Sequence, residues 1–397
     1  MTKAQPEPVV HPTTRSCPFD PHDGLRELRE ERPLAPMRCD GGRRGWLVTS
    51  HALVREVLTD PRFGSSYEML KFPITVADSE QPAPPGLFSV LDPPEHTWYR
   101  RKLSAGFGPR RMRAMTSLIE RIVADRLTAM RRAGGPADLV TAFAEPVTHQ
   151  VIGELLGIRI ADEEAFRRST EKMFTLAGDG DRMGEGWAEL SAVLAEFVHE
   201  KRERPGDDLL SALNADDELS AEEITTMAVI LVTAAQDATT SVFALGSYAL
   251  LANPDQLDAL RAAPSLIDSA VEELLRYLTI NQFGSTRVAL ADFEFHGESL
   301  RYGDLMTLSL AAANRDPAQF PDPDRLDLTR AASGHLAFGH GVHHCFGAQL
   351  ARIVLRTGFA GLLRELPGLR LAIPAAEVQM RDDSLNYSVR SLPVDWD

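Results

Sequence analysis

The sequence has few cysteines and no excess of positive charge, and these two shortages exclude several classes of protein. Only Cys17, Cys39 and Cys345 occur in 397 residues, too few and too irregularly spaced for a disulfide framework or a four-ligand zinc site. The 42 Lys and Arg are outnumbered by 57 Asp and Glu, for a formal net charge of -15, which argues against nucleic-acid binding. We therefore expect a cytoplasmic protein in which any basic docking site is a local patch.

The sequence also lacks a recognisable targeting segment. The first twenty residues contain no apolar core of the length that a signal peptide needs, and their prolines predict a loose leader over residues 1–20. One internal run, residues 227–252, is almost uncharged and long enough to cross a bilayer. Ser220 and Glu223 form a helix-capping pattern ahead of it and Asp237 lies at its centre, so we favour a buried central helix and no membrane.

Hydrophobic sequence with helical periodicity is abundant. Hydrophobic residues make up 44% and charged residues 25% of the chain, near the averages for soluble proteins with a sizeable core. Helical periodicity covers residues 113–132, 145–157, 164–173, 187–203, 266–278 and 348–366. Strand patterns are limited to residues 45–49 and a hairpin around His296-Gly297. An apolar central helix must be wrapped by others, so we predict one domain over residues 21–397, mostly α with a small β region.

The richest chemistry lies in residues 338–347, where three glycines and three histidines surround Cys345 ahead of an amphipathic helix. A helix N-terminus favours the thiolate form of a nearby cysteine. Three interpretations are open at this point. Cys345 is a buried structural cysteine, a nucleophile with His343 or His344 as its base, or the ligand of a metal cofactor that needs one protein thiolate.

The pattern F-G-x-G-x-x-x-C-x-G in this segment resembles the haem-binding signature of the cytochrome P-450 family, and other motifs follow in the family's order over nearly the whole chain. The resemblance implies the P-450 fold around one haem b, with Cys345 as the proximal iron ligand and Phe338 beside the sulfur. The thiolate then favours cleavage of the O–O bond. A loop pressed against a flat macrocycle has no room for side chains, which accounts for Gly339, Gly341 and Gly347.

Further motifs support the same resemblance. The run from Asp92 to Arg101 is similar to the family's D-P-P-E-H-x-x-x-R helix, and four basic residues match its propionate partners: His96, Arg100, Arg287 and His343. The family's E-x-x-R motif, which locks the loop behind the haem, matches Glu273 and Arg276, and we expect Arg325 to complete this structural trio.

The central helix departs from the family pattern. It reads Ala234-Ala235-Gln236-Asp237-Ala238-Thr239, in which Ala234 is expected against the haem and Asp237 keeps the family's acid. Ala238 replaces the threonine that helps to deliver protons during oxygen activation. Thr239 lies about 200° round a regular helix from Asp237 and cannot share its face without a bulge. Either the substrate or a water supplies the missing hydroxyl, or the enzyme couples radicals without inserting oxygen.

The resemblance also implies a substrate and redox partners. The expected substrate contacts are Phe88, Ala235, Ile280, Phe283 and Asn386, and their mixed character favours a medium-sized amphipathic molecule. Residues 177–181 are a candidate lid. A basic cluster at residues 100–113 predicts docking of a ferredoxin, itself reduced by a ferredoxin reductase. We therefore expect a monomeric monooxygenase that hydroxylates its substrate with O2 in natural-product biosynthesis; the alternatives are oxidative coupling and a non-catalytic haem binder or gas sensor.

Overall fold

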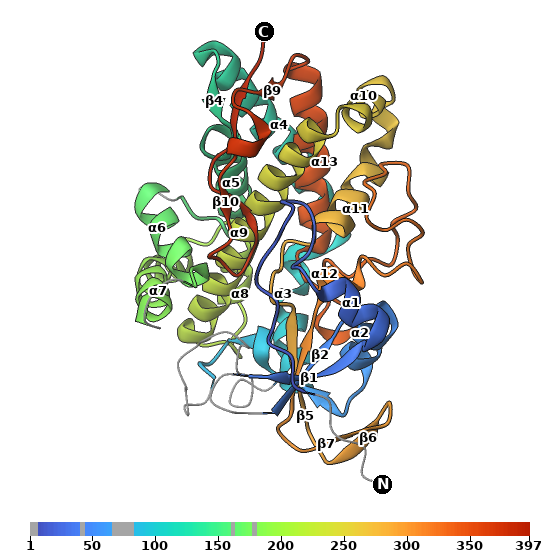
Figure 1. Ribbon diagram of the computed structural model, residues 1–397. Coiled ribbons are helices and arrows are strands. Elements are labelled where there is room, and N and C mark those ends of the chain that lie inside the picture. Colours follow the sequence, from blue (N-terminus) through green and yellow to red (C-terminus); the bar gives the residue numbers. More distant parts are fainter. Residues whose placement is uncertain (1–6, 40–43, 66–82, 160–162, 177–180) are drawn as a thin grey trace.

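The computed structural model describes residues 7–39, 44–65, 83–159, 163–176 and 181–397 (Figure 1). Its longer helices are α4 (Pro109–Ala133), α5 (Glu145–Leu156), α6 (Glu163–Phe174), α7 (Asp181–Glu203), α9 (Ala221–Ala252), α11 (Ile267–Leu278) and α13 (Ala348–Glu365). The shorter ones are α1 (Leu25–Glu31), α2 (His51–Thr59), α3 (Glu95–Leu103), α8 (Leu209–Asn214), α10 (Pro254–Ala262) and α12 (Leu310–Ala313).

Four small sheets accompany the helices in the described part of the chain. The largest has the strand order β1-β2-β8-β5-β3, formed by Leu34–Arg38, Arg44–Val48, Leu305–Leu308, Ser285–Ala289 and Phe63–Gly64. A second sheet joins β4 (Ala137–Asp138), β12 (Pro393–Asp395) and β9 (Arg370–Leu371). The others are the hairpin β6 (Phe293–Phe295) with β7 (Glu298–Leu300) and the pair β10 (Met380–Arg381) with β11 (Ser388–Val389). The mostly α fold with a small β region is confirmed, as is the hairpin around His296-Gly297.

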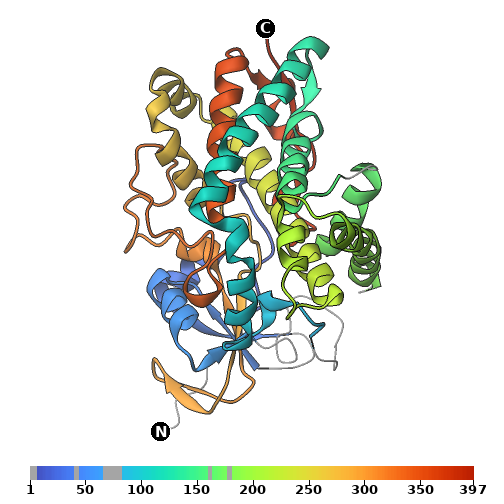
Figure 2. The ribbon, with the colours of Figure 1, turned by 180° about the vertical axis from the view of Figure 1, so that it is seen from behind.

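Helix α9 runs through the middle of the helical part, while the five-stranded sheet lies at one end of the molecule (Figure 1). Seen from behind, α4 and α13 lie side by side across the back of the helical part (Figure 2). By length and composition α9 matches a membrane span, but 67% of its most apolar window is buried inside the fold. The expected capping box is present, since Ser220 Oγ accepts from Glu223 N and Glu223 Oε2 accepts from Ser220 N. The apolar run is therefore the core helix of the domain.

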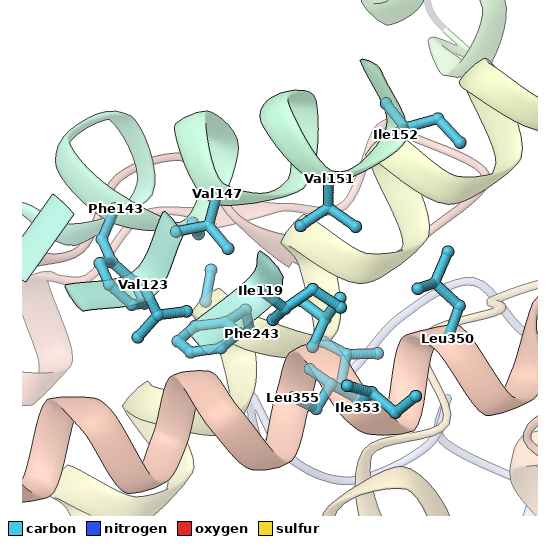
Figure 3. Packing of buried hydrophobic residues seen from close by; sticks show 14 of the residues in the cluster. Ile119, Val123, Phe143, Val147, Val151, Ile152, Phe243, Leu350, Ile353 and Leu355 are labelled. Carbon is cyan, nitrogen blue, oxygen red and sulfur yellow. The ribbon is translucent and has the colours of Figure 1, made fainter. Parts of the chain in front are cut away.

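The main core lies where α4, α5, α9 and α13 meet (Figure 3). Phe243 of α9 stacks on Phe359 of α13 with ring centroids 4.5 Å apart, and Phe143 tilts against its other side at 5.2 Å. Gly358 makes this approach possible, because a Cβ there would lie 2.2 Å from the Phe243 ring. The sequence of α13 thus brings the helix that follows Cys345 tightly against the central helix.

The predicted loose leader is wrong for residues 7–20. Val9 forms a parallel bridge with Met37 of β1, and the His11 side chain is only 5% exposed. The Arg15 guanidinium lies over the Tyr387 ring, 3.8 Å from its centroid. Prolines here favour an extended segment, and burial against the body of the protein orders it.

A buried ion pair on α11 holds the loop between α12 and Cys345. Glu273 and Arg276 are both fully buried, with 2.7 Å between Arg276 Nε and Glu273 Oε2. Arg276 Nη1 also donates to the carbonyls of Asn314 and Pro323, at 2.8 and 2.9 Å. These hydrogen bonds hold the loop against α11, and a structural role of this kind is what we expected of the motif.

The third member of the trio is Arg330 and not Arg325. Arg330 Nε donates to Glu273 Oε1 at 3.1 Å, and its guanidinium also contacts the carbonyls of Pro321, Asp322 and Arg325. Arg325 instead points outward, with 70% of its side chain exposed and its guanidinium bonded to Asp327. The loop turns between these two arginines, so the later one reaches the buried carboxylate.

We predict that Arg330→Met lowers the free energy of unfolding by about 2–4 kcal/mol, because it removes a charged partner from a buried carboxylate and leaves three carbonyls unpaired. Arg325→Met is the matched control, and a change within about 0.5 kcal/mol is expected for this exposed side chain. Chemical denaturation of both variants measures the difference. Equal losses in the two variants would contradict the assignment.

Candidate active site

A cavity of about 410 Å³ lies between the middle of α9 and the loop that carries Cys345. The loop and the first turns of α13 form one wall, and α9 forms the opposite wall. The remaining sides come from α3, α5, the end of α11, the turn at Phe88–Val90 and the segment around Asn386. The lining is mainly apolar with a few polar groups, which is typical of a site for an organic ligand.

The Cys345 loop is a tight turn closed by backbone hydrogen bonds. Cys345 N donates to the Phe338 carbonyl at 2.8 Å, and His344 N donates to the Gly341 carbonyl at 3.0 Å. Gly341 has φ +72°, and a Cβ there would lie 2.4 Å from the Leu58 carbonyl. Position 341 therefore requires a glycine because α2 approaches it closely. We had expected a group bound in the cavity to impose this requirement.

Gly339 and Gly347 do line the cavity. A Cβ on Gly347 would meet nothing within 4 Å, and one on Gly339 only the His343 carbonyl at 3.9 Å. The backbone here borders open space next to the sulfur of Cys345. This shape fits a flat group laid against the loop.

The Cys345 thiol faces the cavity at the start of α13. Burial raises its pKa, while the N–H groups of Gly347 and Ala348 and the positive charges of Arg100 and Arg352 act in the opposite direction. These groups favour a thiolate, and a bound cation is the remaining factor that would complete its stabilisation. A metal ion bound at the sulfur would supply that cation.

The nucleophile interpretation of Cys345 lacks a base. The ring of His343 lies against His96, 4.1 Å between centroids, and its Nε2 has no hydrogen-bond partner. The ring of His344 lies near Phe338 instead, 6.3 Å between centroids. Within the described part of the chain, no group of three or more His, Cys, Asp or Glu is placed to hold a metal. A cofactor that needs one protein thiolate is the interpretation that the geometry favours.

His96 and His343 line one edge of the cavity, and Arg287 and the carboxylate of Asp92 act on the His96 ring from close by. His96 is 2% exposed, and neither of its ring nitrogens has a partner. Burial lowers the pKa of His96 to about 4 and that of His343 to about 3, and the charge of Arg287 acts in the same direction on both. Burial also lowers the pKa of Arg287 to about 10. Such a cluster is costly unless anionic groups pair with it, and the two propionates of a haem fit it.

Arg100 lies on the same face of α3 as His96, but its guanidinium contacts the Cys345 loop. Its Nη1 donates to the His344 carbonyl at 2.9 Å, and its guanidinium lies over the Phe346 ring at 4.9 Å. Arg100 thus braces the residues on either side of Cys345, and because it also lines the cavity its contact with a propionate stays a prediction.

The middle of the α9 wall of the cavity is made of small residues, and Ile230, Leu231 and Val242 lie on either side of them. Ala234, Ala235, Ala238 and Thr239 line it, and the helix is unbroken from Ala221 to Ala252. Asp237 is not among the lining residues. The expected separation of Thr239 from Asp237 on opposite faces of a regular helix is what the structure has.

Asp237 instead faces the C-terminal segment. Its Oδ1 forms an ion pair with Arg381 Nη2 at 2.8 Å, and its Oδ2 accepts from Asn386 Nδ2 at 2.8 Å. Sequence analysis missed Arg381, which lies 144 residues further along the chain in a segment with no local motif. Asn386 lines the cavity, so the acid contacts the cavity indirectly through an amide.

Among the expected substrate contacts, Phe88, Ala235, Ile280 and Asn386 line the cavity. Phe283 does not. Its ring packs against the rings of His11 and His22, with centroids at 5.7 and 5.9 Å. The ordered N-terminal segment provides this second hydrophobic site, and that is why the prediction for Phe283 is wrong. The candidate lid at residues 177–181 lies almost entirely outside the described residues.

Comparison with known proteins agrees with this geometry. The family model "Cytochrome P450" matches residues 172–367. The chain is 43% identical to cytochrome P450 105C1 of a Streptomyces species, over the full length of both chains. Among solved structures, CYP105P1 in complex with filipin I superposes with a TM-score of 0.93 at 40% identity, covering 98% of this chain and 99% of that one. The LnmA cytochrome P450 hydroxylase from the leinamycin pathway of Streptomyces atroolivaceus gives 0.87 at 40% identity, covering 98% and 100%.

We predict that Arg287→Met speeds the loss of haem about 10- to 100-fold, since a charge-assisted pair contributes roughly 1.5–3 kcal/mol. Transfer of haem to an excess of apomyoglobin measures the rate. Arg301→Met, which removes an exposed arginine outside the cavity, is the control and should release haem at the wild-type rate. An unchanged rate in Arg287→Met would contradict the role of this cationic edge.

Proposed function

This chain belongs to the cytochrome P450 family of haem-thiolate monooxygenases, and from that premise we propose that it hydroxylates a medium-sized organic molecule in natural-product biosynthesis, with electrons from a ferredoxin. Membership of a family of monooxygenases sets aside a non-catalytic haem binder or gas sensor. One observation carries the proposal: Cys345 faces a cavity that the middle of α9 closes on the other side, and His96 and His343 at its edge have buried ring nitrogens without a hydrogen-bond partner.

We propose haem b as the cofactor, and the described residues suit it. Cys345 is the one cysteine that lines the cavity, so it would supply the thiolate ligand, and no second cysteine is there for thioether attachment. His96, Arg100, Arg287 and His343 would pair with the propionates, and Phe338 would pack beside the sulfur. When bound, a haem with a thiolate ligand supplies oxygen activation. The chain then holds the cofactor, orients the substrate and limits access of water.

Hydroxylation of a natural-product substrate is supported by the cavity and by the similar proteins. Apolar groups such as Phe88, Ile230 and Val242 alternate with the polar Asn281 and Asn386 along its lining, which suits an amphipathic molecule. One similar structure is named as a hydroxylase of the leinamycin pathway, and another holds filipin I. The setting that we propose is a monomeric enzyme of the cytoplasm.

Oxidative coupling is a second candidate, and Ala238 favours it. The side chain of Ala238 faces the cavity where a hydroxyl group would take part in proton transfer. Thr239 also lines the cavity and offers a hydroxyl one residue further on. The two reactions differ in outcome, because hydroxylation places an oxygen atom from O2 in the product and coupling does not.

The first test is a pair of measurements on purified protein. We predict that the reduced carbon monoxide complex of the wild type shows a strongly red-shifted Soret band, and that Cys345→Ala abolishes the band because the thiolate is lost. Turnover under isotope-labelled O2 should then place one labelled atom in the product. Unlabelled product would overturn hydroxylation in favour of coupling, while a wild type without the red-shifted band would overturn the assignment of Cys345.

The proposed ferredoxin dock lies beside the Cys345 loop and is smaller than the sequence indicated. Lys102 is paired with Asp216 and Glu218, and Arg111 lies 3.6 Å from Asp207. The exposed cations of the cluster are Arg101, Arg110 and Arg113. Phe107, just ahead of α4, contacts Phe346 next to Cys345, with ring centroids 4.6 Å apart. The exposed cations therefore adjoin the thiolate side of the site, where an acidic partner gains most from them.

We predict that Arg110→Glu raises the KM for an acidic ferredoxin about tenfold at low salt, with little change in kcat and a smaller effect at high salt. Arg132→Glu places the same charge change on the exposed far end of α4 and should leave the KM unchanged. Steady-state reduction assays with varied ferredoxin measure both. Equal effects of the two variants would contradict a dock beside Cys345.

A further inference from the structure

We propose that Asp237 is a positioning residue, which fixes the amide of Asn386 so that the cavity presents hydrogen-bond acceptors to a donor group of the substrate. The inference rests on the proposed function and specifies its substrate: a molecule with a hydroxyl or N–H group at the end that meets Asn281 and Asn386. Asp237 of the central helix then contributes to recognition of the substrate through Asn386.

The position of Asp237 is fixed from outside the cavity. Arg381 Nη2 lies 2.8 Å from Asp237 Oδ1 and also donates to Ser241 Oγ, one turn further along α9, at 2.8 Å. Asp237 is 6% exposed, so this ion pair is shielded from competing water. The second carboxylate oxygen is therefore held in one place and serves only as an acceptor.

The fixed carboxylate determines which way the Asn386 amide points. Asn386 Nδ2 donates to Asp237 Oδ2 at 2.8 Å, and a carboxylate cannot accept from the amide oxygen. Asn386 lines the cavity, so its Oδ1 is the amide atom that is left to contact a ligand there. An asparagine with a free choice of orientation would offer either a donor or an acceptor; this one offers an acceptor.

Asn281 adds a second acceptor next to the first. The two residues face each other across an isolated antiparallel bridge, and Tyr387 N donates to the Ile280 carbonyl at 2.7 Å. Asn281 lines the cavity, and its Oδ1 is buried without a hydrogen-bond partner. A buried acceptor without a partner is costly. The Asn281 amide lies at the cavity wall, and a small rotation of this side chain would bring its Oδ1 to a donor of the ligand, which removes that cost. Two neighbouring acceptors therefore select for hydroxyl or N–H groups and against ethers and esters.

The test compares two series of ligands that bind the haem iron through an imidazole. One series carries a terminal hydroxyl on alkyl chains of increasing length, and the other carries a terminal methoxy group, which accepts but cannot donate. Titration of the Soret shift gives a Kd for each compound. At the chain length that reaches the two amides, the hydroxyl compound should bind about tenfold more tightly in the wild type.

Three variants test which residues cause the preference for the hydroxyl ligand. Asn281→Leu leaves the Asp237 ion pair intact and should remove most of the preference. In Asp237→Asn, the new amide oxygen faces Arg381 and its N–H faces Asn386, which then turns its own N–H toward the cavity; the preference should fall to near parity. Gln379→Leu makes the same amide-to-leucine change at an exposed position outside the cavity and should keep the full preference. Thermal unfolding and the carbon monoxide spectrum verify that each variant is folded.

The outcomes separate the inference from the proposed function. A Soret shift without any hydroxyl preference in the wild type, or a preference that persists in either Asn281→Leu or Asp237→Asn, would overturn the inference alone. Failure of any imidazole to shift the Soret band would overturn the haem-thiolate assignment and this inference with it. Should Asp237→Asn fail to fold, Asn281→Leu still decides, because its loss of preference is required.

Discussion

The buried ion pair between Glu273 and Arg276 is the interaction on which the geometry around Cys345 depends. Arg276 donates to the Asn314 carbonyl, and the Asn314 side chain in turn accepts from Leu336 N at 2.7 Å, two residues ahead of the Cys345 loop. Two charges that are wholly removed from water are stable only while every partner is in place. The fold therefore couples the shape of the cysteine loop to a rigid contact behind it.

The electrostatics of the cavity have the opposite character. Where the Glu273 pair is fully satisfied, His96, His343 and Arg287 are buried together with Asp92 as a nearby carboxylate, and burial lowers the pKa of all three. Such an arrangement costs free energy in the protein alone, and binding of a dianionic group removes that cost. Any ligand that binds the folded state alone stabilises it by mass action, so haem contributes to the stability of the fold as well as to its chemistry.

Contiguous motifs were predictable from the sequence, and long-range partners were not. The Cys345 loop, the capped central helix and the Glu273–Arg276 pair each follow from local spacing. The choice of Arg330 over Arg325 depends on how an irregular loop turns, which no periodicity encodes. Phe283 was misplaced for a similar reason, because its partners come from an N-terminal segment whose prolines indicate only that it is not helical.

The single acid in an otherwise apolar stretch of α9 illustrates how one constraint produces several features. An unpaired carboxylate in the core is excluded by its desolvation cost, so Asp237 requires a cation and a donor from another part of the chain. Arg381 and Asn386 supply them, and this binds the C-terminal segment to the central helix next to the cavity. The replacement of threonine by Ala238 leaves these contacts untouched. Asp237 is accordingly held in place by the ion pair and the hydrogen bond that its charge requires. This is independent of the route by which protons reach the site.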